Sequence, residues 1–327
     1  MKEIPLPTDA DLHAEAVALA PPPEWQVRSW EELGETLEGR RSGLKALRLA
    51  ARAEAYRLAQ RAAGRSREAA AAAPSPATAN ATATAATAAA LVTMADHDAL
   101  FLLAFLRHAK FNTAAACARL RRFVGFLENN PWSLSPDWKV LEETYGGRAG
   151  PISVVPTPSL SGERVLVLTL ERTFRFTPTD MGNIVNHAIF WGLVCLLREP
   201  SAQLGGVCFV DDFATLGLWQ LRLVGSEGNR NMWYMLQQIL PLRLRGIHVC
   251  QQPIIFSLVW RVASTFITRK VRDRLRLYGQ DTTKLVETIG AHGVPESAGG
   301  TAVVTTDRTL TAVLQGIEDT PWLPAAR

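Results

Sequence analysis

The sequence predicts an α/β protein in which a helical N-terminal region precedes a mostly parallel sheet. Two observations carry this prediction. Before about residue 130, apolar residues recur at helical spacing among charged ones. From residue 151 onward, short and nearly continuous apolar runs of strand length alternate with helical stretches. Such alternation is typical of a parallel sheet whose strands are buried on at least one face.

The N-terminal region is predicted to contain helices separated by disordered segments. Residues 1–24 are rich in proline and polar residues, so we expect them to be disordered. From residue 25 to about residue 67 the pattern is helical, with Leu44 and Leu47 at helix spacing. Residues 69–90 are almost wholly Ala and Thr with two prolines. Because they carry no large side chain that could form a core, we expect a flexible insertion there.

Two further helices are expected in this helical N-terminal domain, which we place at residues 25–148. Residues 96–111 (DHDALFLLAFLRHAKF) have acidic residues in the first turn and basic residues at the end, as the helix dipole favours. The second helix is expected over Asn112–Leu127. The Asn-Asn-Pro sequence at 129–131 should end it.

The C-terminal half is predicted to form the sheet. Helical stretches at about 180–198 and 229–239 separate the predicted strands, and another helix follows the last of them. The strand candidates are VLVLTLE (165–171), GVCFVDDF (206–213) and GIHVCQQP (246–253).

The charge distribution, the cysteines and the lengths of the apolar runs indicate which partners and which compartment to expect. From Leu242 to Arg276 the chain carries a net charge of +7, whereas the remainder carries −3, which suggests a localised anionic partner. The 4 cysteines lack metal or redox spacing, so free thiols in a reducing, cytoplasmic compartment are expected. No secretory signal is visible at the N-terminus. The longest apolar run, around Ile189–Leu197, is far shorter than the ~20 residues that span a bilayer, so we expect a soluble protein with peripheral, transient membrane contact.

The segment after the third predicted strand is the most informative. IIFSLVWRVASTFI (254–267) is predicted to be a helix that is apolar on most of its circumference. We interpret it as a lid, with one face over a cavity and the other available to a bilayer. The following TRKVRDRLRL (268–277) is predicted to be a basic amphipathic helix, which suits interfacial membrane binding.

These residues resemble the CRAL-TRIO lipid-binding family, in particular the branch of tocopherol transfer protein, retinaldehyde-binding protein and clavesin. The matching text is PLRLRGIHVCQQPIIFSLVWRVASTFITRKVRDRLRLYG (241–279), followed by VPESAGGT (294–301). In addition, FLLAFLRHAKFNTAAA (101–116) resembles the helix pair of the family's N-terminal domain. The resemblance covers roughly residues 96–301, and ordered motifs over such a length are far more specific than one short motif.

The resemblance implies a helical bundle beside an α/β lipid-binding domain at residues 149–301, with a hydrophobic cavity under a helical lid and a C-terminal tail at 302–327. It implies that the lid includes Phe256, Val259, Ala263 and Ile267. It implies a phosphoinositide-binding basic cleft of Arg243, Arg245, Lys270 and Arg274. The implied cavity wall comprises Ile184, Val185, Ile189, Val207, Met232, Met235, Leu236, Leu240, Leu242 and Ile247.

The chain departs from the family pattern at several positions. Asp211 stands where the family has an aromatic residue, Gln251 where it has Asn, and Tyr278 where it has His. Ala109 stands where close relatives often carry a further Arg. These departures allow the ligand to differ from those of the relatives.

Several polar residues have alternative interpretations. Asp211 and Asp212 are adjacent in a predicted strand and therefore face opposite sides of the sheet, so catalysis by the pair is not expected. His248 is expected to be a hydrogen-bonded core histidine, because no second metal ligand or acid lies at a suitable spacing. Asn186 or His187 could instead recognise a polar group of the ligand.

Two functions follow as hypotheses. The first is binding and intermembrane transfer of a hydrophobic small molecule such as a tocopherol, a retinoid or a similar lipid, with docking on phosphoinositides or other anionic lipids. The second is a lipid-sensing adaptor that recruits partners through the N-terminal extension and the tail after Thr301. We expect no enzymatic activity, cofactor, metal site or nucleic-acid partner.

Overall fold

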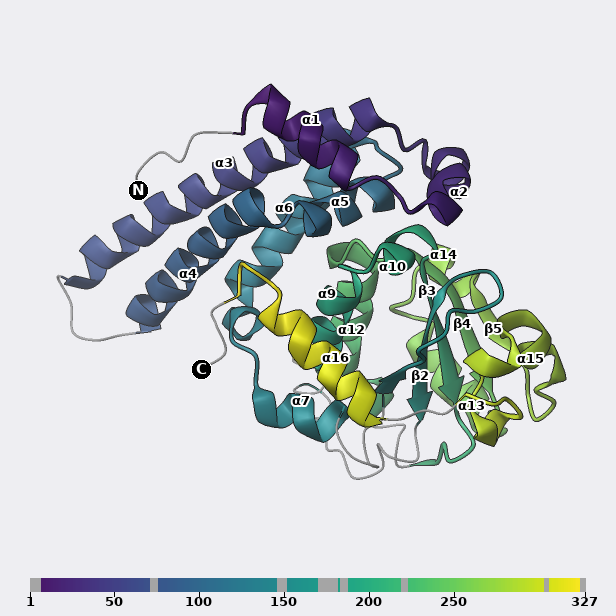
Figure 1. The fold of residues 1–327 in the computed structure, drawn as a ribbon. Coiled ribbons are helices and arrows are strands. Elements are labelled where there is room, and N and C mark those ends of the chain that lie inside the picture. Colours follow the sequence, from purple (N-terminus) through teal and green to yellow (C-terminus); the bar gives the residue numbers. More distant parts are fainter. Residues whose placement is uncertain are drawn as a thin grey trace. The chain divides into compact units, whose positions relative to one another are not determined.

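A computed structural model of the 327-residue chain describes residues 7–70, 76–145, 152–169, 182, 188–218, 223–302 and 306–323. The chain divides into two compact units. The first comprises Met1–Leu134 with Thr320–Arg327, and the second comprises Ser135–Asp319. Each unit is described by itself below, and their elements are drawn in Figure 1.

The first unit consists of helices. Its two longest helices, α3 and α4, lie side by side (Figure 1). The aromatic rings of Phe101, Phe105, Phe123 and Trp322 form the centre of its core, with the Phe101 ring centroid 5.6 Å from each of the other three. The helices are α1 (Asp9–Ala18), α2 (Pro23–Leu33), α3 (Leu37–Ala70), α4 (Pro76–His97), α5 (Ala99–His108), α6 (Thr113–Asn129) and the short η1 (Pro131–Leu134).

Residues 76–90 of the Ala/Thr-rich segment are helical, so the prediction of a flexible insertion over 69–90 was wrong for this described part. Helix α4 begins at Pro76, and the first turn of a helix tolerates proline because its N–H would have no partner there. Thr87 and Leu91 are fully buried. Alanine has the highest helix propensity, and its small side chain lets α4 pack closely on α3, which is itself rich in alanine.

Residues 9–18 are helical, which corrects the expectation of disorder for the described part of residues 1–24. Helix α1 is capped by Thr8, whose hydroxyl accepts a hydrogen bond from the backbone N–H of Asp11. Leu12 and Ala16 are buried. The two terminal nitrogens of the buried Arg48 guanidinium, Nη1 and Nη2, donate to the Glu15 carboxylate at 2.6 Å. This pairing fixes α1 on α3.

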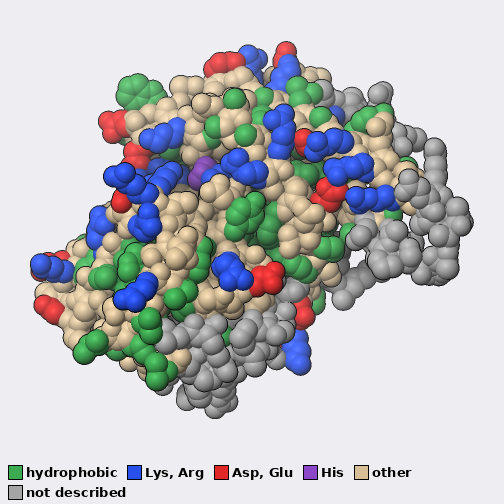
Figure 2. Space-filling view, turned by 180° about the vertical axis from the view of Figure 1, so that it is seen from behind, with side chains coloured by type: hydrophobic (Ala, Val, Ile, Leu, Met, Phe, Trp, Pro, Cys, Tyr) green, Lys and Arg blue, Asp and Glu red, His purple; other side chains and the backbone are tan. Residues whose placement is uncertain are grey.

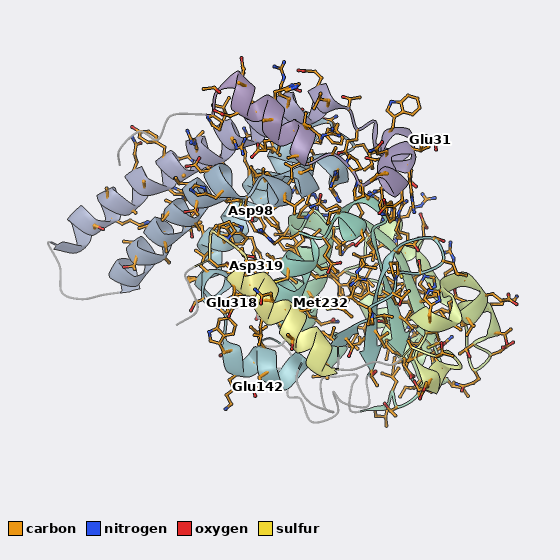
Figure 3. The ribbon with its side chains drawn as sticks, viewed as in Figure 1. Glu31, Asp98, Glu142, Met232, Glu318 and Asp319 are labelled. Carbon is orange, nitrogen blue, oxygen red and sulfur yellow. The ribbon has the colours of Figure 1, made fainter. Side chains whose placement is uncertain are left out.

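The described part of the expected tail after residue 301 is also folded. Helix α16 (Thr306–Glu318) buries Val313 and Ile317 within the second unit. Trp322, which belongs to the first unit, is only 3% exposed. Its indole N–H donates to the carboxylate of Asp98, which is labelled in Figure 3. Packing of these apolar side chains therefore orders α16 and the segment around Trp322.

The second unit is built on a five-stranded sheet in the order β1-β2-β3-β4-β5. Strand β1 runs antiparallel to β2, and all the other neighbours are parallel, which confirms the predicted mostly parallel sheet. The three predicted strands are present as β2, β3 and β4. The strands are β1 (Ile152–Val154), β2 (Arg164–Thr169), β3 (Val207–Asp212), β4 (Leu244–Cys250) and β5 (Leu275–Leu277).

The sequence predicted one basic amphipathic helix over 268–277, and this prediction was wrong. Only a single turn, α14 (Arg269–Arg272), is helical. The chain then forms β5, which pairs with β4 through Ile247 opposite Leu275. The alternation of Leu and Arg over 275–277 has the period of a strand, and pairing with the sheet satisfies its backbone.

Different helices cover the two faces of the sheet. On one face, Leu285 and Ile289 of α15 (Thr283–Ile289) pack on Val165 and Val210. On the other face lies α13 (Phe256–Ala263), together with α9 and α12. The remaining elements are α7 (Trp138–Tyr145), α9 (Phe190–Leu196), α10 (Pro200–Leu204), α12 (Glu227–Tyr234), the π-helical η5 (Met235–Ile239), η6 (Ala291–Gly293) and η7 (Glu296–Ala298).

Candidate functional site

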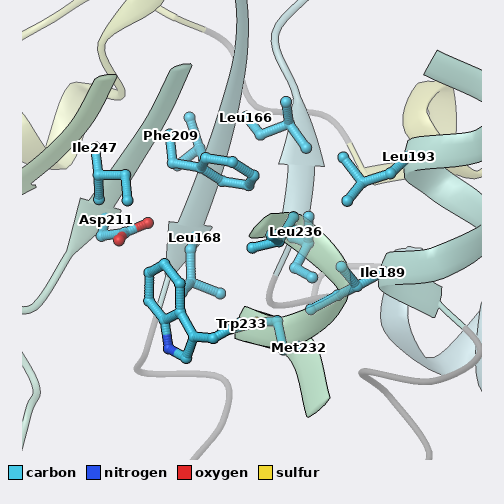
Figure 4. Close-up of a pocket in the computed structure, with 12 residues that line it drawn as sticks. Leu166, Leu168, Ile189, Leu193, Phe209, Asp211, Met232, Trp233, Leu236 and Ile247 are labelled. Atoms are coloured by element: carbon cyan, nitrogen blue, oxygen red, sulfur yellow. The ribbon is translucent and has the colours of Figure 1, made fainter. Parts of the chain in front are cut away.

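A cavity of about 70 Å³ lies between the sheet and the helices α9, α12 and η5 of the second unit (Figure 4). Its wall is almost entirely apolar. Asp211 is the one charged side chain among the residues that line it. The lining residues are Ile152, Leu166, Val167, Leu168, Ile189, Leu193, Phe209, Asp211, Met232, Trp233, Leu236 and Ile247.

Alternate residues of the strands point to the same face of the sheet, and this explains which strand residues line the cavity. Leu166 and Leu168 are two residues apart on β2, and Phe209 and Asp211 are two apart on β3, so each pair shares a face. The register sets Leu166 opposite Phe209, Leu168 opposite Asp211, and Phe209 opposite Ile247. Side chains of three neighbouring strands therefore form one continuous wall.

On the opposite side of the cavity, the lining residues come from helices and are four residues apart. Ile189 and Leu193 are four residues apart at the start of α9, and Met232 and Leu236 are four apart where α12 continues into η5. Met232 is also labelled in Figure 3. The π-helical turn of η5 supplies Leu236 to the wall, and such turns occur frequently at functional sites.

Asp211 and Asp212 face opposite sides of the sheet, as their adjacency in a strand predicts. Asp212 accepts hydrogen bonds from the Ser297 hydroxyl at 2.7 Å and from the Ala214 backbone N–H at 3.0 Å. Asp211 faces the apolar cavity instead, and burial raises its pKa to about 7. The two carboxylates cannot act on one bond.

The predicted cavity residues fall into three groups. Ile189, Met232, Leu236 and Ile247 line the cavity. Ile184 and Val185 lie outside the described residues, as do Asn186 and His187. The remainder are buried but are not among the lining residues of this cavity, namely Val207, Met235, Leu240 and Leu242.

Sequence reasoning missed most of the strand side of the wall, including Leu166, Leu168 and Phe209. The signal for them was present, because they are alternate residues of two predicted strands. The sequence does not indicate which face of each strand lines the cavity, because both faces of these strands are largely apolar.

The predicted lid residues do not line this cavity, and the closing of a hollow interior by helix 254–267 stays a prediction. Phe256, Val259 and Ala263 of α13, with Ile267, pack into a side-chain cluster on the sheet. The Phe256 ring lies 5.5 Å from that of Phe213. This cluster adjoins the cavity through residues that belong to both, namely Phe209, Trp233 and Ile247.

The outer face of α13 exposes an apolar stripe. Leu258 and Val262 are four residues apart and therefore lie on one side of α13, and Ile254 lies in the turn that precedes the helix. Ile254 is 97% exposed, Leu258 43% and Val262 40%. Arg261 beside them is exposed as well. We call Ile254, Leu258 and Val262 the apolar stripe of α13.

Three of the four predicted basic residues converge where β3 and β4 begin. Arg243 donates to the carbonyl oxygens of Gln203 and Leu204. Arg245 donates to that of Gly205 at 3.0 Å. Arg274 donates to the Leu244 carbonyl, and burial together with the positive charge of Arg245 lowers the pKa of Arg274.

The fourth residue, Lys270, is exposed on α14. Gly206 permits the convergence of the arginines, because its φ of +90° is accessible to glycine and an added Cβ would lie 2.5 Å from the Arg243 carbonyl oxygen. Lys and Arg side chains also gather on the face of the molecule that Figure 2 shows. We call Arg243, Arg245, Lys270 and Arg274 the basic group.

His248 is a hydrogen-bonded core histidine, as predicted. Its Nδ1 lies 2.8 Å from the hydroxyl of Tyr278, and the two rings stack at 5.7 Å. Burial lowers the pKa of His248 to about 4, so the ring is neutral at physiological pH. Within the described part of the chain, no group of three or more His, Cys, Asp or Glu side chains could hold a metal ion.

Among the described residues, no single helix is long and apolar enough to cross a membrane. One sharply bent pair, Ala81–His97 with Ala99–His108, meets the length and composition of a span.

Comparison with known proteins identifies the second unit. The family model for the CRAL/TRIO domain matches residues 152–300. The alpha-tocopherol transfer protein-like protein of Homo sapiens is 26% identical over 226 residues, which cover 68% of this chain and 64% of that protein. Clavesin-2 of Rattus norvegicus is 24% identical over 209 residues, covering 62% of each chain. The chain thus spans less than two thirds of the length of these relatives.

Among solved structures, the crystal structure of Sfh5 superposes with a TM-score of 0.43 and 10% identity, covering 66% of this chain and 80% of that one. This similarity is too low to carry an argument. The assignment rests on the match over 152–300, on the two relatives and on the mixed α/β fold. Residues 152–300 of this chain are therefore a CRAL/TRIO domain.

Proposed function

We propose that this protein binds a hydrophobic small molecule in the cavity of its CRAL/TRIO domain and carries it between membranes without catalysing a reaction. The observation that carries the proposal is the apolar cavity enclosed between the sheet, α9 and α12. An internal apolar space is expensive to maintain unless it has an occupant, because its lining atoms lose packing contacts. One relative is named for tocopherol transfer, which supports a tocopherol-, retinoid- or similar lipid ligand.

The volume of the cavity has a consequence for the mechanism. A buried water needs about 10–15 Å³, so about 70 Å³ holds only a few waters. A lipid-sized ligand therefore requires the walls to separate. The α13 cluster shares Trp233, Phe209 and Ile247 with the cavity wall, so movement of α13 away from the sheet would enlarge the cavity.

Contact with a membrane would favour the movement of α13 away from the sheet. The apolar stripe of α13 can enter the interface of a bilayer, while the basic group attracts phosphoinositides or other anionic lipids. Each Lys or Arg near an anionic surface contributes about 1 kcal/mol, so the four residues would give reversible attachment. The protein would then act in the cytoplasm and visit membranes transiently.

The alternative, a lipid-sensing adaptor, would recruit partners through the N-terminal extension and the tail after Thr301. These segments contain helices α1 and α16, which bury Leu12 and Ala16, and Val313 and Ile317, against the rest of the protein. This favours the carrier over the adaptor.

Transfer of a fluorescent lipid from donor to acceptor vesicles tests the proposal. We expect the protein to accelerate transfer, and acceptor vesicles containing phosphatidylinositol phosphates to increase the rate. A variant with Ala at Arg243, Arg245, Lys270 and Arg274 should lose vesicle co-sedimentation but retain the ligand. Binding of lipid without any acceleration of transfer would support the adaptor instead, and failure to bind any apolar probe would refute both.

A further inference from the structure

Resting on the proposed function, we infer that Asp211 determines ligand specificity: it selects an apolar molecule that carries a hydroxyl group, which hydrogen-bonds to the Asp211 carboxyl inside the cavity.

The position of Asp211 is unusual for an acid. It lies on the central strand β3, between Leu168 of β2 and Val249 of β4, and it shares its face of the strand with Phe209 and Phe213. Figure 4 shows its carboxyl group among apolar side chains of the cavity wall. Its carboxyl group has no hydrogen-bond or ion-pair partner among the described residues.

A structural role does not account for this acid. The neighbouring Asp212 caps a turn and bonds to Ser297, whereas the side chain of Asp211 does neither. The Asp211 side chain is half-buried. Withdrawing a polar group from water without giving it a hydrogen bond is unfavourable, and an apolar residue at this position would continue the wall at lower cost. A ligand with a complementary polar group would remove that penalty.

The surroundings decide which polar group fits best. The elements that face the Asp211 carboxyl contribute Leu168, Ile247, Ile189, Leu193, Met232, Trp233 and Leu236, none of which titrates. Cys250 is the nearest titratable side chain on the adjacent strand, and burial raises the pKa of its thiol to about 12, so it stays neutral. Asp212 points to the opposite face of the sheet.

Among the described residues that line the cavity, Asp211 is therefore the one that titrates, and burial raises its pKa to about 7. Both the acid and the carboxylate are populated at physiological pH. A hydroxyl group both donates and accepts, so it satisfies either form. A ketone can only accept and pairs with the protonated acid alone, and a hydrocarbon pairs with neither.

Displacement of the neutral fluorescent probe N-phenyl-1-naphthylamine by 1-decanol, 2-decanone and decane tests the inference at pH 6 and pH 8. We expect the intact protein to prefer 1-decanol to decane by about ten- to hundredfold, the effect of one hydrogen bond to an otherwise unsatisfied carboxyl group. The affinity for 2-decanone should fall from pH 6 to pH 8 as Asp211 ionises, while that for 1-decanol changes much less.

Two substitutions at Asp211 sharpen the test. Asp211→Leu should bind decane and 1-decanol equally well, and Asp211→Asn should keep the preference for 1-decanol while losing the pH dependence for 2-decanone. Glu287→Gln, which removes an exposed acid from α15, serves as the matched control and should behave as the unmodified protein.

The outcomes separate this inference from the function on which it rests. Displacement by all three competitors with the same ratios in the intact protein and in Asp211→Leu would overturn the inference alone. If no competitor displaced the probe from any form, both the cavity function and the inference would fail. If Asp211→Leu did not fold, Asp211→Asn and the pH dependence of the intact protein would still decide.

Discussion

Trp322 and Asp98, 224 residues apart in the sequence, are joined by a 3.0 Å hydrogen bond from the indole Nε1 to Asp98 Oδ2. The other carboxylate oxygen of Asp98 caps α5 by accepting from the Phe101 backbone N–H at 3.1 Å. The Trp322 ring packs on Phe101 at 5.6 Å. One buried acid thus fixes both the start of a core helix and the C-terminal segment.

Trp322→Ala should consequently destabilise the first unit. Removing a buried tryptophan costs about 3–5 kcal/mol, and here it also removes a hydrogen bond to the buried Asp98. Urea unfolding followed by circular dichroism measures the change. Trp30→Ala is the control, because Trp30 is 64% exposed and its loss should change the free energy of unfolding by less than about 0.5 kcal/mol.

The pH dependence of stability should reveal two opposing groups in the second unit. The pKa of His248 falls from 6.5 to about 4 on folding, so the stability due to its neutral ring is lost as pH falls from 6.5 toward 4. The pKa of Asp211 rises from 3.8 to about 7, so its contribution is lost as pH rises from 3.8 toward 7. Between pH 4 and 6.5 the two effects oppose each other.

Single variants should expose each effect. Asp211→Asn should leave a protein whose free energy of unfolding increases from pH 4 to pH 6.5, whereas His248→Gln should leave one in which it decreases. Denaturant titrations of both variants at several pH values measure the slopes. Identical slopes in the two variants would contradict the assigned pKa shifts.

The sheet was predictable from sequence because β2, β3 and β4 are compact apolar runs between helical stretches. Strand β5 was not, because Arg274 and Arg276 flank and interrupt its leucines and make the segment look like a basic helix. Its strand conformation depends on pairing with β4, a long-range contact that local pattern does not contain. Helix α4 was missed for a related reason: its stability comes from close packing of alanines on α3.

Apart from Ile247 of β4, the site was predictable only on its helical side. Met232 and Leu236 have the spacing of a helix face, whereas the choice between the two apolar faces of β2 depends on which helix covers each. For α13, a helix apolar around most of its circumference was consistent with a lid over a cavity. The same composition equally suits its actual packing, with Phe256 and Val259 on a solid cluster and Leu258 exposed.

Within the basic group, Lys270 and Arg245 should respond differently to substitution. Lys270 is exposed, so Lys270→Ala should weaken vesicle binding without changing the melting temperature. The Arg245 guanidinium also holds the Gly205 carbonyl, so Arg245→Ala should lower both vesicle binding and stability. Co-sedimentation and thermal unfolding, measured on the same samples, separate the two effects. Arg245→Lys should restore part of the vesicle binding, because charge alone attracts the anionic surface.

The apolar stripe of α13 gives a prediction of its own. Ile254→Asp should reduce binding to anionic vesicles severalfold, because an apolar side chain that enters the interface is replaced by a charge of the same sign as the lipids. Ile254 is 97% exposed, so the fold should be unaffected. Leu160→Asp introduces the same charge at a site that is 65% exposed and outside α13, and it should bind vesicles normally. Equal losses in both variants would mean that net charge, not insertion, governs the contact.

Leu193 on α9 allows ligand binding to be separated from stability. It is 1% exposed and lines the cavity. Leu193→Ala should lower the free energy of unfolding by about 2–5 kcal/mol, as for other buried leucines, while it enlarges the cavity and preserves binding of an apolar probe. Leu193→Phe should do the reverse: the larger ring can occupy the existing space at modest cost, and it should exclude the probe.

Probe displacement and urea unfolding on the two variants complete this test. A carrier cavity requires the more stable variant to bind worse and the less stable one to bind well. If probe binding instead followed stability, falling in Leu193→Ala and surviving in Leu193→Phe, the space beside α9 would be a packing defect rather than a ligand site.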